Sequence, residues 1–352
     1  MRVLVCGRGA ADPRSAVSAH VVGSLRELGH EVITFDPVAV GQSGFIRSDA
    51  EGALRHLLHT YGPHILVHVP TPGDLSARQV RLATAETGTV AVAVHTSTVF
   101  ADAVTRHHDV EEALAEYDLT TVCDPSVYQR LAPYGSYRLS MLAPAVEPSM
   151  LDRAIEPERR DGVVIIGEPD DRGADIARKV LEAGVSLRLY GSGWSLHPDL
   201  VEHSFGRVAH SELGNVLAGA ALHLELPAHV SSQALAQISA WEAPVSQCTL
   251  DAAAVATPTL TLERGGISSV FSPGSDIATF VSDADVVQLV PMLLADQQGL
   301  REMGEAAADT VRSTALWSQR WDALFAPFAS ADDDGEYVVV ESALVERVPV
   351  TV

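Results

Sequence analysis

A carboxylate followed by a glycine pair is the arrangement in this sequence best suited to binding a ligand. Asp251 lies in a segment of small residues that predicts a helix, and Pro258 ends that helix. The β-branched run 259–262 predicts a short strand, which Gly265 and Gly266 follow as a turn. Ligands of open parallel sheets bind beyond the carboxyl ends of the strands. The segment therefore predicts a carboxylate and unshielded backbone amides beside a ligand.

A histidine occupies a comparable position in the N-terminal half. His95 follows the predicted strand 89–94, at the point that faces a ligand in such sheets. An imidazole there can hydrogen-bond a sugar hydroxyl or stabilise developing charge. A histidine that only completes a strand end is an equally good interpretation of this residue alone.

Two other kinds of site are disfavoured. The turn Gly7-Arg8-Gly9 follows the first strand, but the third glycine of a dinucleotide-binding pattern would fall on Asp12, whose charge would repel a pyrophosphate. Three widely separated cysteines and two isolated histidine pairs do not have the spacing of metal ligands. No Asp-x-Asp follows a predicted strand, so we expect neither a metal nor a cofactor.

Strands and helices alternate along the chain, which predicts an α/β fold with parallel sheets. In the N-terminal half, strands are predicted at 3–6, 31–35, 64–69, 89–94 and 119–123, and helices at 15–28, 49–61, 75–87, 110–117 and 126–131. In the C-terminal half, strands are predicted at 162–166, 186–190, 222–226 and 259–262, and helices at 174–183, 211–217, 231–240, 250–256, 284–294, 298–312 and 317–328.

The polar, proline-containing segment 146–161 suits a hinge between two domains. We predict an N-terminal domain over 1–148, a hinge over 149–161 and a C-terminal domain over 162–329, whose terminal helix is free to pack back on the N-terminal domain. Residues 330–352 are predicted to form an acidic linker and a β-rich tail.

Composition limits the class of protein. A chain of 352 residues, 47% hydrophobic and 20% charged, has enough core material for two globular domains. The net charge of −22 argues against nucleic acid or an anionic membrane as partner. No apolar run is long enough to span a membrane, and the N-terminal strand is not a signal peptide. We expect a cytoplasmic protein and leave a homodimer open.

Five segments, in this order, resemble GT-B glycosyltransferases. They are GEPDDRGAD (167–175), LRLYGSGW (187–194), LDAAAVATPTLTLERGG (250–266), FSPGSDIATFVSDAD (271–285) and SQRWDALF (318–325). The nearest resemblance is to the CgeB-like spore-maturation group and, more distantly, to glycosyltransferase family 4. VAVAVHTS (90–97) also looks like the family 4 strand that ends in a histidine. The resemblance implies two Rossmann-like domains that face each other across a cleft.

The resemblance also implies that the C-terminal domain holds a nucleotide-diphosphate sugar. Asp251 would bind the donor ribose, and Gly265 and Gly266 would bring backbone amides to the phosphate or the sugar. His95 would contact the transferred sugar and is the catalytic candidate.

Further donor contacts are implied around the first two strands of that domain. Gly191, Gly193 and Trp194 would shape the base and ribose pocket. Arg172-Gly173 matches a family Lys-Gly pair whose cation contacts the diphosphate, a contact that arginine can make with two hydrogen bonds.

The sequence departs from the family 4 pattern in two places. Glu168 stands where those enzymes usually have an arginine, so that Arg8, Arg188 or Arg264 would have to supply a phosphate-binding cation instead. The family's second acidic residue would fall on Ala243.

We therefore expect a glycosyltransferase with a nucleotide-sugar donor and a sugar acceptor, which is a small molecule or an envelope component. The mechanism implied by family 4 is retaining, and the absence of an Asp-x-Asp after a predicted strand indicates that it needs no metal. The departures keep open a catalytically silent GT-B protein that scaffolds or activates a partner enzyme, and a nucleotide-sugar epimerase is a weaker third alternative.

Overall fold

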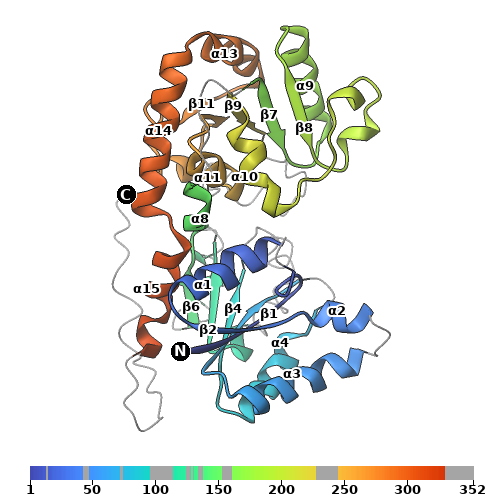
Figure 1. Cartoon of the computed structure of the whole chain (residues 1–352), viewed down its shortest axis with the longest axis vertical. Helices are drawn as coiled ribbons and strands as arrows, with labels where there is room; N and C mark the ends of the chain where they lie inside the picture. Colours follow the sequence, from blue (N-terminus) through green and yellow to red (C-terminus); the bar gives the residue numbers. More distant parts are fainter. Residues whose placement is uncertain are drawn as a thin grey trace. The chain divides into compact units, whose positions relative to one another are not determined.

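The computed structural model describes residues 1–12, 15–42, 47–71, 74–95, 114–123, 128–129, 131–133, 138–152, 161–226 and 245–329. It divides into two compact units, each built on one parallel sheet (Figure 1). The predicted α/β class with two parallel sheets is thereby confirmed. None of the described helices is long and apolar enough to cross a membrane.

Unit 1 contains residues 1–143 and the last helix. Its six-stranded sheet has the order β2-β1-β3-β4-β5-β6. The strands are β1 (Arg2–Gly7), β2 (Glu31–Phe35), β3 (Ile65–Val69), β4 (Val90–Val94), β5 (Leu119–Val122) and β6 (Leu139–Met141). The helical segments are η1 (Ser18–Gly23), α1 (Ser24–Glu27), α2 (Pro37–Gln42), α3 (Arg47–Tyr61), α4 (Ala77–Ala85) and α15 (Trp317–Ala329).

Unit 2 contains residues 144–316. Its five-stranded sheet has the order β11-β10-β9-β7-β8. The strands are β7 (Val163–Ile166), β8 (Leu187–Tyr190), β9 (Leu222–Glu225), β10 (Thr259–Leu262) and β11 (Ala278–Phe280). The helical segments are α8 (Pro148–Leu151), α9 (Asp171–Glu182), η4 (Trp194–Leu196), η5 (Val201–His203), α10 (His210–Ala218), α11 (Gln247–Ala254), α12 (Gly265–Ser268), α13 (Asp283–Ala295) and α14 (Gln297–Thr314).

Both faces of the unit 2 sheet are covered by helices, which explains why the side chains of its strands are largely buried. Val163 and Ile165 point into a core shared with α9 and α13, whereas Val164 points into a core shared with α10, α11 and α14. Figure 1 shows α9 and α13 at one side of this sheet. The alternation of side chains along β7 therefore fixes two hydrophobic layers.

The chain passes between the two units at two connections. The second unit begins at Pro144, so the polar segment 149–161 lies within it. Helix α15 belongs to unit 1, where it packs against α1. Trp317, Trp321 and Phe325 are buried, and the Trp321 indole Nε1 donates a hydrogen bond to the His20 carbonyl. Three large aromatic side chains thus anchor the end of the chain in the first unit.

Candidate functional site

The unit 2 sheet has one position at which its strand order reverses. Strand β8 lies on one side of β7 and β9 on the other, so the loops that leave β7 and β9 diverge. Ligands of open α/β sheets bind in the crevice outside such strand ends. The candidate site therefore consists of the residues that end β7, β8, β9 and β10, which lie at one edge of the sheet because the strands are parallel.

A buried ion pair joins the ends of β9 and β10. Glu225 is the last residue of β9, and its Oε1 and Oε2 lie 3.1 and 3.0 Å from Arg264 Nη2. Both side chains are buried. Thr261 donates to the same carboxylate and accepts a 3.0 Å hydrogen bond from Arg264 Nη1. Burial alone would raise the pKa of Glu225, but the Arg264 charge and hydrogen bonds from neighbouring hydroxyls outweigh it and lower that pKa.

Arg264 also determines where the glycine pair lies. It is the extended residue before α12, the four-residue helix that begins with Gly265 and Gly266. The backbone N–H of Ile267 bonds to the Arg264 carbonyl at 3.0 Å. The N–H groups of Gly265 and Gly266 come earlier in this turn, where a helix leaves its donors unpaired. The backbone N–H groups of Gly265 and Gly266 therefore lie at the carboxyl end of β10.

Gly191 and Gly193, which follow β8, pack closely against the loop after β7. A Cβ on Gly191 would lie 2.1 Å from the Gly167 carbonyl oxygen, and its φ of 153° also excludes an L side chain. A Cβ on Gly193 would lie 2.9 Å from Pro169 Cδ. Because side chains are excluded at both positions, the loops after β7 and β8 pack in direct backbone contact.

Trp194 is fully buried behind these loops. Its indole Nε1 donates a 2.8 Å hydrogen bond to the Gly167 carbonyl, and its side chain belongs to the apolar core under α9. The ring also lies beside Gly173, where a Cβ would be 3.9 Å from Trp194 Cη2. The tryptophan therefore supports the loop after β7 from within the core, and Gly173 packs on it.

Glu168 binds the loop that follows β8. Its Oε2 accepts a 2.8 Å hydrogen bond from the Gly193 N–H, and its Oε1 lies 3.4 Å from Arg207 Nη2. Arg207 also donates to the Ser192 hydroxyl. Hydrogen bonds from the Ser192 and Gly193 backbone N–H groups lower the pKa of Glu168. Glu168, the residue that departs from the family 4 pattern, is thus an ionised carboxylate that accepts hydrogen bonds from backbone N–H groups.

Arg172 and Arg188 are engaged by other parts of unit 2. Arg172 lies in the first turn of α9, and its Nε and Nη2 donate to Asp283 Oδ1 at 2.9 and 2.6 Å. Arg188 Nη2 donates to the carbonyls of Asp161 and Gly219, which precede β7 and β9. Arg188 therefore lies towards the amino ends of the strands, and the structure does not bring it to the carboxyl edge.

Asp251 lies inside α11 and is completely buried. Its Oδ1 accepts a 2.9 Å hydrogen bond from Gln247 Nε2, and its Oδ2 has no hydrogen-bond partner among the described residues. Burial raises the pKa of Asp251 to about 7, against the opposing Gln247 hydrogen bond and the His210 charge, while Glu147 raises it further. The predicted ribose carboxylate is therefore a buried acid with one unused oxygen.

The two candidates in the N-terminal half belong to unit 1. His95 follows β4, and its backbone N–H donates a 3.3 Å hydrogen bond to the Thr121 carbonyl. Burial, and then the charge of neighbouring His68, lower the pKa of His95 to about 3, so the imidazole is neutral at physiological pH. Arg8 follows β1 and is exposed. Both therefore lie at the carboxyl edge of the unit 1 sheet.

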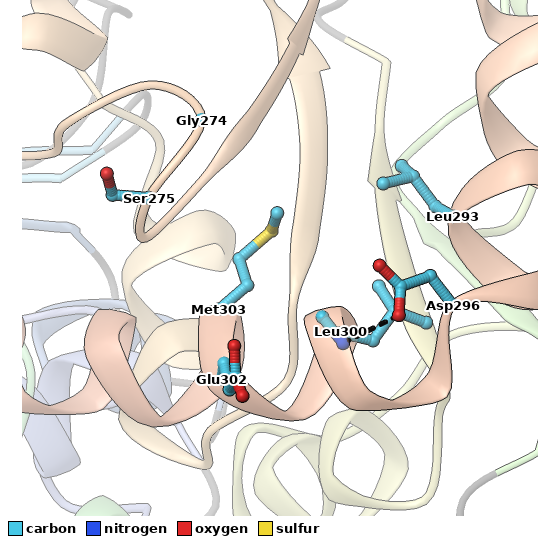
Figure 2. Close-up of a pocket in the computed structure, with 8 residues that line it drawn as sticks. Gly274, Ser275, Leu293, Asp296, Leu300, Glu302 and Met303 are labelled. Atoms are coloured by element: carbon cyan, nitrogen blue, oxygen red, sulfur yellow. Dashed lines mark hydrogen bonds between the residues drawn. The ribbon is translucent and has the colours of Figure 1, made fainter.

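Two cavities among the described residues of unit 2 lie at the amino ends of its strands, opposite the ends of β7, β8, β9 and β10. One, of about 350 Å³, is bounded by Gly274 and Ser275 before β11, by Asp296 between α13 and α14, and by Met303 of α14 (Figure 2). Another, of about 430 Å³, is lined by residues that precede β7, β8 and β9, such as Ser186. Amino-terminal strand ends are not where ligands of parallel sheets bind, so neither cavity is the candidate site.

Comparison with known proteins finds a family match within the C-terminal part of the chain. A family model described as glycosyl transferase-like matches residues 172–326. No curated protein matches the sequence.

Solved structures extend the similarity to both units. HepE from Anabaena, in complex with UDP and glucose, has a TM-score of 0.64 at 11% sequence identity, covering 94% of this chain and 100% of its own. Sucrose-phosphate synthase from Thermosynechococcus elongatus has a TM-score of 0.64 at 12% identity and the same coverage. A glycosyltransferase from Rickettsia africae has a TM-score of 0.60 at 11% identity, covering 92% of this chain and 96% of its own. These similarities confirm the predicted GT-B fold.

Two residues that make contacts between strand ends of unit 2 were not predicted from the sequence. Glu225 ends the apolar strand β9, and a charged residue directly after three buried ones was the available signal. Arg207 lies in an irregular segment that carries no comparable signal. Contacts between strand ends, rather than motifs, reveal both residues.

Proposed function

We propose that the protein is a glycosyltransferase that uses a nucleoside diphosphate sugar as donor. The family match over 172–326 carries this proposal, because it covers the strand ends at which the glycine donors and the Glu225–Arg264 pair lie. HepE of the same fold holds UDP and glucose, so UDP-glucose is the first donor to test. The acidic chain favours a small or neutral acceptor over an anionic polymer.

The proposed roles follow from donor and acceptor chemistry. The N–H groups of Gly265 and Gly266 would hydrogen-bond the anionic end of the donor, and Asp251 would accept ribose hydroxyls at its unused oxygen. Neutral His95 would hydrogen-bond the transferred sugar. In the reaction the bond from the sugar anomeric carbon to phosphate breaks, a bond to the acceptor oxygen forms, and the acceptor proton leaves.

We further propose a retaining, metal-independent reaction, in which fixed dipoles and cations stabilise the departing diphosphate. Arg264 is the cation nearest in sequence to Gly265 and Gly266. Its guanidinium group is held in position by hydrogen bonds to Glu225. Acceptor binding and domain closure complete the cycle in this proposal.

A second candidate function is a catalytically silent GT-B protein that scaffolds or activates a partner. The observation that favours it is the engagement of the predicted phosphate cations in unit 2. Arg172 is paired with Asp283, Arg188 with backbone carbonyls and Arg264 with Glu225. Glu168 adds a negative charge where family 4 has a positive one. A diphosphate would have to displace one of these partners.

Thermal unfolding with UDP, GDP, ADP and TDP tests donor binding. A ligand at 100 times its dissociation constant stabilises the native state by about 2.7 kcal/mol, so at least one nucleotide should raise Tm by several degrees. Asp251→Asn should weaken that shift, whereas Asp175→Asn, an exposed change on α9, should preserve it. If no nucleotide at millimolar concentration changes Tm, the donor proposal fails.

Turnover separates the two candidate functions. Release of UDP from UDP-glucose, measured with and without a panel of small hydroxylated acceptors, is expected for the transferase. Nucleotide binding with no release for any donor would support the silent scaffold. Nuclear magnetic resonance of the product anomer then tests the retaining stereochemistry.

A further inference from the structure

Unit 1 contains a buried polar cluster that the proposed transfer does not use. Cys6 lies in β1 and His68 in β3, and the two are direct partners in the parallel pairing of these strands. Asp74 follows β3 and reaches back to the same place. All three side chains are buried. The cluster lies where the unit 1 strand order reverses, since β2 and β3 flank β1.

The cluster brings three different ligand atoms together. One ligand atom each from Cys6, His68 and Asp74 lie within 4.8 Å of one another. His68 Nε2 and Asp74 Oδ2 are 3.5 Å apart, and neither has a hydrogen-bond partner among the described residues. Leaving two such atoms buried without a hydrogen bond costs free energy, roughly 1–3 kcal/mol for each. An additional group that contacts both atoms would remove this cost.

The separation of these atoms fits a shared cation better than a hydrogen bond. Nitrogen–oxygen hydrogen bonds measure about 2.7–3.2 Å, shorter than the 3.5 Å seen between His68 and Asp74. In a tetrahedral zinc site, bonds of about 2.05 Å to nitrogen and 2.1 Å to oxygen place the two ligand atoms about 3.4 Å apart. The pair is therefore already near the spacing of two zinc ligands.

We propose that Cys6 Sγ, His68 Nε2 and Asp74 Oδ2 bind one zinc ion, with the fourth position open to water. Thiolate, imidazole and carboxylate together are a zinc ligand set. A thiolate and a carboxylate neutralise the 2+ charge, which permits burial of the ion. The ion fixes the carboxyl end of β1 to the segment after β3, and it is separate from the proposed donor contacts in unit 2.

Tyr117 supports this assignment from behind the imidazole. Its hydroxyl lies 2.6 Å from His68 Nδ1, the ring nitrogen that faces away from Asp74. Metal-bound histidines usually hydrogen-bond through their second ring nitrogen, which orients the ring. Loss of such an outer partner typically weakens metal binding by about 10–100-fold.

Cobalt titration of the full chain, first dialysed against a chelator, tests the site directly. We expect one equivalent of Co²⁺ to bind and to give a near-ultraviolet thiolate-to-cobalt charge-transfer band, which one equivalent of Zn²⁺ abolishes. Cys6→Ser should remove the band, and Asp74→Asn should weaken binding. Cys248→Ser, which changes a cysteine in unit 2, is the matched control and should keep the band.

Tyr117→Phe tests the site without removing any of the three ligands, so that its result does not depend on whether the ligand variants fold. It should retain the band and bind Co²⁺ about 10–100-fold more weakly. The proposal is overturned if the wild-type chain binds no equivalent of Co²⁺ or Zn²⁺. It is also overturned if the band persists in Cys6→Ser, or if Tyr117→Phe binds as tightly as the wild type.

Discussion

The Glu225–Arg264 pair gives the sharpest prediction for stability. Arg264→Met keeps an unbranched apolar side chain but leaves the Glu225 carboxylate buried without its cation. Breaking a buried ion pair in this way costs about 3–5 kcal/mol. For a unit of this size each kcal/mol lowers Tm by about 2–4 °C, so a fall of about 6–20 °C is expected. Replacing both residues, as in Glu225→Leu with Arg264→Met, should recover most of that loss.

The pH dependence of the Tm loss distinguishes an unpaired buried Glu225 carboxylate from a packing defect. In the native wild type the pKa of Glu225 is lowered, so the carboxylate stabilises the fold above its unfolded pKa, and that contribution is lost as the pH falls through the folded pKa. In Arg264→Met, burial should raise the pKa of Glu225. The cost of burying the unpaired Glu225 charge then applies only at pH values at which this carboxyl group is ionised. The Tm difference between Arg264→Met and wild type should therefore narrow as the pH falls from 7 towards about 4.

Differential scanning calorimetry of the full chain measures these shifts. Arg312→Met, which removes the partner of exposed Asp309, is the matched control and should leave Tm nearly unchanged. A loss below about 1 kcal/mol in Arg264→Met at pH 7 would refute the reasoning. So would a Tm difference that stays constant down to pH 4.

Three further predictions concern single residues. Because the pKa of Asp251 is raised to about 7, the native state holds a proton that the unfolded state has lost, and stability should fall as the pH rises from 4 to 7. Asp251→Asn should remove this fall, which is on the order of a few kcal/mol, and a Tm–pH profile parallel to wild type would contradict it. Gly191→Ala should cost about 3 kcal/mol or more by urea unfolding because its Cβ meets the Gly167 carbonyl, whereas Gly52→Ala, in open space within α3, should gain about 0.5–1 kcal/mol. With a pKa of about 3, His95 should show a neutral imidazole from pH 5 to 8 by nitrogen-15 resonance, and protonation above pH 5 would contradict the buried environment.

Regular elements were predictable where local signals were strong. The strands 31–35 and 259–262 were predicted at their observed bounds, since turn residues bracket each β-branched or apolar run. The three-residue strands β6 and β11 were missed because they are too short to show a period. Helix α9 begins three residues before its predicted start, because the Asp170 carboxylate caps it by accepting from the Gly173 N–H.

The sequence predicts which residues of the candidate site follow a strand, but it does not predict which side chains of the site contact each other. The sequence places the glycine pair correctly after β10, because a strand followed by glycines is a local pattern. It cannot show that Arg264 meets Glu225, which lies 39 residues away, or that Arg172 meets Asp283, 111 residues away. These partners depend on strand order, which is a property of the tertiary fold. The roles proposed for His95 and Asp251 stay predictions.

The aromatic anchor of α15 has a consequence for synthesis on the ribosome. Unit 1 needs the last helix, but all of residues 144–316 must be translated before that helix emerges. At about 5–20 residues per second this takes roughly 10–35 s, during which the apolar surface that receives Trp317, Trp321 and Phe325 lacks its cover. The second unit, which is continuous in sequence, can fold in this interval. The order of folding is thus set by the chain path: the unit that is made first is the one that is completed last.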